Sequence, residues 1–285
     1  MSLNSVNTNY GAMVALQSLN RTTTELTSAQ KEISTGYRVA DANDDGAAYA
    51  VAQRVRSDVG ALTSANQQLG NVQGLLSTTS SSLNDVSSTM NNARQVLIKL
   101  SDSNIQGTER ASYVQQYQSY IANIKTDFQD ADYNGKTLIG DVTGSSGTFG
   151  RVAVVRNENG GSYGIATFSG SAFLGSVNFT STQLNGASTV AALIGTASSA
   201  TFINQLNSLG TAMASYGAAN NYVNNQISYN SDKIDALNSG LGSLIDANLA
   251  QESALLQSLQ IKQQLGTQAL SIANQAPQTL LSLFK

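Results

Sequence analysis

An unbroken heptad pattern between Leu62 and Leu100 constrains the fold more than any other feature. Apolar or small side chains recur at alternating spacings of three and four residues over twelve consecutive positions, of which only Thr79 is polar. Val55 extends the pattern one heptad upstream. This period is typical of long helices that pack along their length. We expect the core of this rod to contain Leu62, Leu69, Val72, Leu76, Leu83, Val86, Met90, Leu97 and Leu100.

A straight helix over Val55–Leu100 would be about 70 Å long, at 1.5 Å per residue, and needs partners of similar length. A separate helix is expected upstream, where a register of its own is set at four-three spacing by Ala12, Leu16, Leu19, Thr23, Leu26, Gln30 and Ile33. Gly36 suits the position after that helix. A further helix is expected from an N-cap at Thr108 through Tyr113, Tyr117, Tyr120, Ile124 and Phe128. The single proline, Pro277, also favours long helices.

Both ends of the chain read as amphipathic helices without charges. No Lys, Arg, Asp or Glu occurs in residues 1–20 or between Lys262 and Lys285. Helices that face bulk water carry charges on their outer surface, so these ends are expected to be buried against each other and against other copies. The residues expected to carry this assembly are Leu3, Val6, Tyr10, Met13, Leu16, Leu19, Leu26, Ile33, Ile245, Leu249, Leu256, Leu259, Leu270 and Leu283.

Residues 140–199 differ from the rest by frequent glycine and by short alternating apolar runs. These runs, at Val152–Val155, Tyr163–Phe168 and Val177–Phe179, predict strands. Before them, Asn134 and Gly135 predict a hairpin turn. Helical periodicity returns from Thr201, and the apolar stripe shifts phase by one residue at Ile245.

The predicted fold class is therefore mainly α, an elongated antiparallel helical rod or coiled coil formed by both chain termini, with a small β-rich insert. We expect terminal assembly helices over 1–40 plus 246–285. A helical rod with a β-hairpin should span 41–139 plus 200–245, and a variable β-rich surface domain 140–199.

Composition excludes several classes of function. The net charge of −3 gives no basic surface for nucleic acid, and no apolar run is long enough for a membrane span. The chain has no His and no Cys, which removes the commonest general bases, nucleophiles and metal ligands. We expect no enzymatic activity and no cofactor. The amino-terminal residues lack the basic and apolar regions of a cleaved signal peptide.

One segment resembles the first half of a calcium-binding loop. Asp41, Asn43 and Asp45 occupy its first, third and fifth positions, and Gly46 the sixth. The twelfth position, where a bidentate Glu is required, is Ala52. The favoured alternative is a turn before a helix, with Asp44 or Asp45 as its N-cap.

A secreted carbohydrate-active or adhesive protein is a competing hypothesis, with its activity in the insert. Asp141 and Glu158 are the only carboxylates there, and no acid pair at catalytic spacing is evident. A glycosylation triplet at Asn178–Thr180 indicates only a surface loop.

With these motifs in place, the chain resembles bacterial flagellin over nearly its whole length except the insert. The carboxyl-terminal match is the most specific and begins at Asp246–Glu252, the run DANLAQE. The other matching segments are Leu3–Asn9, Leu19–Thr22, Ile33–Arg38, Ala42–Ala48, Phe128–Leu138, Leu265–Gly266, Gln268–Leu270, Ala273–Asn274 and Leu281–Phe284. The short insert and the carboxyl-terminal wording look most like flagellins of alphaproteobacteria.

This resemblance implies a subunit that polymerises with copies of itself into the flagellar filament and reaches it unfolded through the flagellar type III export channel. Its termini would fold only on assembly. Further partners implied are other flagellins, the filament cap, hook-junction proteins and an export chaperone. The alternative is a hook–filament junction protein, which shares the terminal helices but does not polymerise without limit.

One departure from the family concerns innate immunity. In flagellins sensed by the Toll-like receptor, the contact positions carry an Arg, a Leu and a Glu. An alignment through Arg94 and the turn at Asn134 and Gly135 places Asn92, Val96 and Gln116 at those positions. Because the charge-assisted contacts are lost, weak recognition by this receptor is expected.

Overall fold

The computed structural model describes residues 8–195 and 202–282, which form a mainly helical protein in two compact units. We call residues 1–58 with 235–285 the terminal unit, and Val59–Ile234 the rod unit. Two long helices, α2 and α7, each contribute to both units. The elements are α1 (Tyr10–Thr35), α2 (Gly46–Leu100), α3 (Gly107–Gln129), β1 (Lys136–Thr137), β2 (Ile139–Gly140), β3 (Thr148–Phe149), β4 (Val152–Val155), β5 (Ser162–Ile165), β6 (Phe168–Ser169), α4 (Gly170–Val177), α5 (Ser181–Leu184), α6 (Ala187–Ile194), α7 (Phe202–Ile245) and α8 (Leu249–Ser282).

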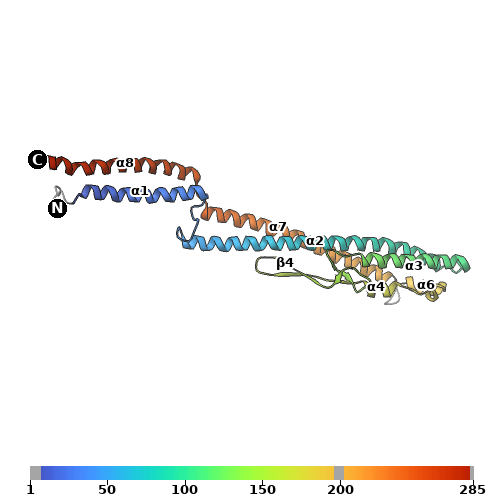
Figure 1. The fold of residues 1–285 in the computed structure, drawn as a ribbon. Coiled ribbons are helices and arrows are strands. Elements are labelled where there is room, and N and C mark those ends of the chain that lie inside the picture. The colour runs from blue at the N-terminus through green and yellow to red at the C-terminus, as the bar shows by residue number, and fades with distance from the viewer. Residues whose placement is uncertain (1–7, 196–201, 283–285) are drawn as a thin grey trace. The chain divides into compact units, whose positions relative to one another are not determined.

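In the terminal unit, α1 and α8 lie side by side and antiparallel, so the amino end of α1 lies near the carboxyl end of α8 (Figure 1). Gly36 ends α1 in the left-handed conformation, with φ of 75°, and its amide donates to the Glu32 carbonyl at 2.8 Å. The predicted end of this helix is confirmed. The predicted phase shift at Ile245 coincides with the break between α7 and α8.

The rod unit is built around α2, whose heptad positions face inward. All nine predicted rod-core residues are at most 7% exposed, as are Ala65, Thr79 and Ala93. Thr79 is tolerated in this core because its hydroxyl donates to the Leu75 carbonyl at 2.8 Å. Among the described residues, no helix is both long and apolar enough to cross a membrane.

Helix α3 packs on this core but begins differently from the prediction. Its N-cap is Gln106, which makes no side-chain capping bond, and Thr108 lies inside the first turn. The expected N-cap at Thr108 is therefore wrong. Tyr117 is fully buried, and its hydroxyl donates to the Val177 carbonyl at 2.5 Å.

The predicted turn at Asn134 and Gly135 is present, with positive φ at both residues. Tyr133 and Lys136 exchange two backbone hydrogen bonds, of 2.8 and 3.0 Å. The ladder does not continue, however, because β1 pairs in parallel with β3 instead. The hairpin at this point is thus a single bridge.

In the described part of the insert, residues 140–195, the strands all lie before Gly170. Strands are present at two of the three predicted runs, where β4 pairs with β5 in antiparallel orientation, and β2 pairs in parallel with β6. The expected strand at Val177–Phe179 is wrong, because Val177 ends α4 and Thr180 begins α5 with a capping box that includes Gln183. In the second half of the insert, the hydroxyl side chains of Ser169 and Thr180 cap α4 and α5, and this local capping favours short helices over a strand.

The insert shares its core with the rod. Phe173, Val177, Leu184 and Val190 are at most 2% exposed and belong to one apolar cluster with residues of α2, α3 and α7. Phe173 also packs edge-on against Phe128 of α3, with ring centroids 5.6 Å apart. The apolar runs of the insert therefore complete the rod core.

Candidate assembly interface

The seam between α1 and α8 is narrow. Leu26, Ala29 and Leu259 form its buried cluster, with Leu256 packed against it. Thr22 is also buried on α1, whereas Leu16, Thr23 and Gln30 are exposed. The predicted register is thus correct at Leu26 but wrong by one residue at Thr23 and Gln30, because the buried face of α1 runs through Thr22 and Ala29 instead.

Close approach is also evident near the amino end of α1. A Cβ atom added to Gly266 would lie 3.3 Å from Leu19 Cδ1. Asn9 caps α1 by accepting from the Ala12 amide at 3.0 Å, and its side-chain amide donates to the Ala273 carbonyl at 2.7 Å. Asn9 therefore fixes both the start of α1 and its position against α8.

At the other end of the pair, main-chain bonds join α1 to the break before α8. The Ala247 amide donates to the Gly36 carbonyl at 3.0 Å, and the Arg38 amide donates to the Ile245 carbonyl at 2.7 Å. Beneath these bonds, Val39, Ala48, Ala52 and Ile245 form a second small buried cluster.

The outer faces of the pair carry large apolar side chains in contact with solvent. Tyr10 is 71% exposed, Met13 61%, and Leu265 and Ile272 are each 64% exposed. The others are Val14, Leu16, Leu249, Leu255 and Ile261. Apolar surfaces of this extent mark sites of protein association.

The fourteen predicted assembly residues fall into several groups in the structure. Leu26, Ile245 and Leu259 are buried, and Leu19, Ile33, Leu256 and Leu270 are half-buried. Tyr10, Met13, Leu16 and Leu249 are exposed. Leu3, Val6 and Leu283 lie outside the described residues.

Sequence reasoning did not single out Val14, Leu255, Ile261, Leu265 or Ile272 as assembly residues. Each is a large apolar residue exposed on α1 or α8. A signal was present for Val14, Leu265 and Ile272, since these three lie within the two uncharged stretches. Leu265 and Ile272 continue the apolar stripe of the carboxyl-terminal stretch, whereas Val14, Leu255 and Ile261 lie off the stripes at three-four spacing.

The side chain of Lys31, from α1, pairs with two carboxylates of the acidic turn before α2. Lys31 Nζ lies 2.7 Å from Asp41 Oδ2 and 2.8 Å from Asp44 Oδ1. These bonds lower the pKa of both carboxyl groups and raise the pKa of Lys31. Asp45 accepts from the amides of Ala47 and Ala48, both at 3.0 Å, which confirms it as the N-cap. The first half of the apparent calcium loop is thus a charge-paired turn.

The carboxyl group of Glu32, on α1, has a pKa above its ordinary value. Burial raises its pKa first, and the negative charges of Glu252 and Asp44 raise it further. Because Glu32 and Glu252 come from α1 and α8, their repulsion opposes the pairing of the two helices at neutral pH.

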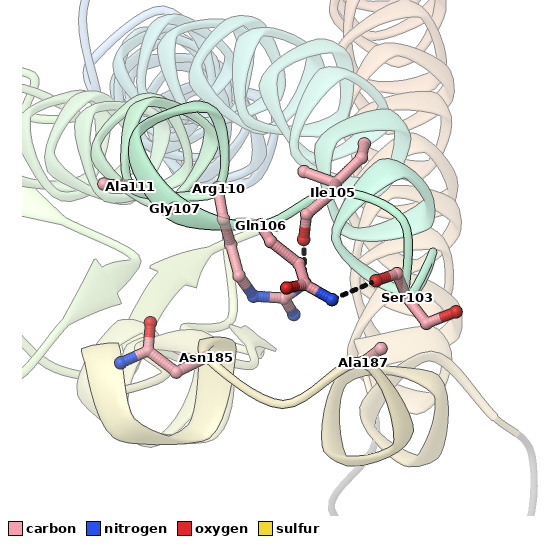
Figure 2. Close-up of a pocket in the computed structure, with 8 residues that line it drawn as sticks. All are labelled: Ser103, Ile105, Gln106, Gly107, Arg110, Ala111, Asn185 and Ala187. Carbon is pink, nitrogen blue, oxygen red and sulfur yellow. Dashed lines mark hydrogen bonds between the residues drawn. The ribbon is translucent and has the colours of Figure 1, made fainter.

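A cavity of about 480 Å³ lies in the rod unit, between the start of α3 and the residues on either side of the α5–α6 connection (Figure 2). Arg110, only 7% exposed, lines it. Its guanidinium donates to the carbonyls of Leu100 at 2.7 Å, Ile105 at 3.1 Å and Leu184 at 2.9 Å. Since Leu100 and Leu184 end α2 and α5, Arg110 binds two helix ends and joins the insert to the rod.

The two carboxylates of the insert are also engaged. Asp141 accepts from the Ser171 hydroxyl at 2.9 Å, and Glu158 pairs with Lys233 at 2.5 Å. Each carboxylate has a partner from another element, as expected of groups that hold the insert together.

A narrow seam flanked by exposed, uncharged apolar faces defines a structural protein that assembles with other chains. Comparison with known proteins agrees. The family model of the bacterial flagellin N-terminal helical region matches residues 6–143, and that of the C-terminal helical region matches residues 181–284. The chain belongs to the bacterial flagellin family, and it is a structural subunit of the flagellar filament.

Full-length relatives support this membership. Flagellin FljM of Caulobacter vibrioides is 32% identical over 100% of both chains, and a flagellin of Brucella melitensis is 32% identical over 99% of both. These are short flagellins of the alphaproteobacterial type. A putative flagellar hook-associated protein from Vibrio parahaemolyticus has a TM-score of 0.59 at 15% identity, covering 71% of this chain and 100% of that one. That likeness concerns the fold alone.

Proposed function

We propose that the α1/α8 pair is the surface through which copies of this chain bind one another in the filament. The proposal rests on the observation that both helices expose large apolar side chains, while residues 1–20 and the residues between Lys262 and Lys285 carry no charge. Burying one Leu, Ile or Met side chain contributes about 1.5–3 kcal/mol. Several such side chains per subunit give a substantial driving force for polymerisation.

The same arrangement supports folding on assembly. Among the described residues, the seam cluster has only three buried members, Leu26, Ala29 and Leu259. Two isolated helices with so small a core are marginal in water. We propose that the terminal helices stay unfolded during passage through the flagellar type III channel, with the amino-terminal segment uncleaved, and acquire their core from neighbouring subunits.

The proposed division of the chain follows from this. Residues 1–40 and 246–285 would form the inner filament layer, residues 41–139 and 200–245 the rod, and residues 140–199 the variable outer domain. The partners are other copies of the chain, together with other flagellins, cap and hook-junction proteins, and a chaperone. Weak recognition by the Toll-like receptor is supported by Val96, which is only 4% exposed and cannot reach a receptor without unpacking the rod.

The test is seeded polymerisation of the purified protein, followed by electron microscopy. Wild-type protein is expected to form filaments without limit, which a hook–filament junction protein would not do. Leu256→Asp places a charge beside the seam cluster and should abolish filaments. Its rod should keep the wild-type melting temperature, because Leu256 lies in the terminal unit. Leu256→Asp filaments of normal length would refute the proposal.

A further inference from the structure

Helix α7 carries a polar stripe that no part of the assembly surface uses. Tyr222, Gln226, Asn230 and Lys233 follow one another at spacings of four, four and three residues, which places them on one face of the helix. Every member of this stripe contacts either the β4–β5 hairpin or Asn230. The β4–β5 hairpin therefore lies along this polar stripe of α7.

Asn230, within this polar stripe, is 0% exposed. Its side-chain amide donates to Asn66 Oδ1 of α2 at 2.8 Å and to the Arg156 carbonyl at the end of β4 at 3.0 Å. Its own Oδ1 accepts from Gln226 Nε2 at 2.9 Å. One side chain thus bonds to three elements, α2, α7 and the hairpin.

The hairpin is held on either side of Asn230. The rings of Tyr163 and Tyr222 stack with centroids 4.1 Å apart, and Arg156 Nη1 donates to the Tyr222 hydroxyl at 3.3 Å. At the loop between the strands, Glu158 pairs with Lys233, and the Glu158 side chain is only 13% exposed. The contacts between the hairpin and α7 thus extend along the polar stripe from Tyr222 to Lys233.

We propose that Asn230 locks the axial register of α2 against α7 and couples that register to the docking of the β4–β5 hairpin. A buried amide left without partners is costly, and a polar residue at a helix–helix seam specifies register for this reason. A slip of one helical turn moves α2 by about 5.4 Å. Asn230 would then lose Asn66, and it could regain an acceptor only by releasing Arg156. Sliding of the rod helices therefore requires undocking of the hairpin.

The chain offers a matched control at Asn224. Like Asn230, Asn224 lies on α7 and bonds to an amide of α2, accepting from Gln73 Nε2 at 2.6 Å. Unlike Asn230, it is exposed, and its own side-chain amide donates to Asn220 Oδ1 within α7 at 3.5 Å rather than to the hairpin. Asn230→Leu and Asn224→Leu each remove one hydrogen bond between side-chain amides of α2 and α7. Only Asn230→Leu also removes a hydrogen bond to the hairpin.

The absence of native cysteine allows spin labels at chosen sites. Labels at the exposed positions Asn159→Cys and Ser228→Cys report the distance from hairpin to α7, and Thr63→Cys with Ser228→Cys reports the α2–α7 register. In full-length Asn230→Leu, both distance distributions should broaden at least about twofold relative to wild type. In Asn224→Leu, the hairpin distribution should remain as narrow as in wild type.

Asn66→Ala provides the sharper test and protects against a failure of Asn230→Leu to fold. The side chain of Asn66 bonds to Asn230 at 2.8 Å and to the Ser231 hydroxyl at 3.4 Å, both on α7. The proposal nevertheless requires its loss to broaden the hairpin distribution as well as the register distribution. Circular dichroism checks that helicity is retained. A hairpin distribution in Asn66→Ala that is as narrow as in wild type would overturn the coupling.

Discussion

At the scale of single residues, backbone conformation decides where α1 ends. Gly36 has φ of 75°, a region in which a Cβ atom is strained, and a Cβ there would meet no neighbouring atom. Its role is therefore purely conformational. Gly240 in α7 also has open space around it, but its φ is not positive, so alanine there would only favour the helix.

These two glycines predict effects of opposite sign in the terminal unit. Gly36→Ala should lower the stability of the assembled terminal helices by about 1 kcal/mol. Gly240→Ala should raise it by about 0.5–1 kcal/mol. Thermal dissociation of filaments, followed by light scattering, measures both. Equal shifts in the same direction would show that the left-handed conformation at Gly36 does not matter.

Glu32 predicts a dependence on pH. Since its folded pKa is raised, its favourable contribution is complete below the unfolded pKa of about 4.5 and is lost as the pH rises through the folded pKa. Glu32→Gln should therefore stabilise the terminal helices at pH 7, and this gain should vanish below about pH 4. Filament dissociation temperatures across this range measure the difference. A gain that is constant with pH would show that the negative charge of Glu32 does not oppose the pairing of α1 and α8.

Some individual roles could be predicted from sequence, and others could not. Asp45 was predictable as a cap because its position before a helix limits what its side chain can reach. Asn230 was not, because its three partners come from segments far apart in the chain. The polar spacing of Tyr222, Gln226, Asn230 and Lys233 was the available signal.

At the scale of elements, the reliability of the prediction follows the length of the pattern. The heptads of α2 repeat often enough that one arrangement satisfies all of them, and their inward positions are buried as predicted from periodicity. The helices α4 to α6 are short, and hydroxyl caps at Ser169 and Thr180 determine where two of them begin. An alternating apolar run such as Val177–Phe179 cannot reveal such caps.

The joint at Arg110 predicts that the insert depends on the rod. Arg110→Met would leave the carbonyls of Leu100, Ile105 and Leu184 without their charged donor and should destabilise the rod unit by on the order of 3 kcal/mol. Amide exchange in α5 and α6 should accelerate together with that at the end of α2. Arg94→Met, at an exposed site on α2, is the control and should change little. Unchanged exchange in α5 and α6 would contradict the role of this joint.

At the scale of the whole molecule, the two units divide the work of a filament subunit. The rod unit has one continuous apolar core that includes the insert, so we expect it to fold within a single chain. The terminal unit has small buried clusters and large exposed apolar side chains, so we expect its stability to come from neighbouring copies. The uncharged ends are thus best understood as surfaces that become interior in the filament.

Leu265 offers the most direct test of this central claim. It is 64% exposed on α8, so Leu265→Asp removes little packing within one chain, and any loss of assembly must come from contacts between copies. Leu265→Met preserves the apolar character at the same site and serves as the control. In seeded polymerisation observed by electron microscopy, we expect no filaments from Leu265→Asp and wild-type filaments from Leu265→Met. Filaments of wild-type length and yield from Leu265→Asp would contradict the account.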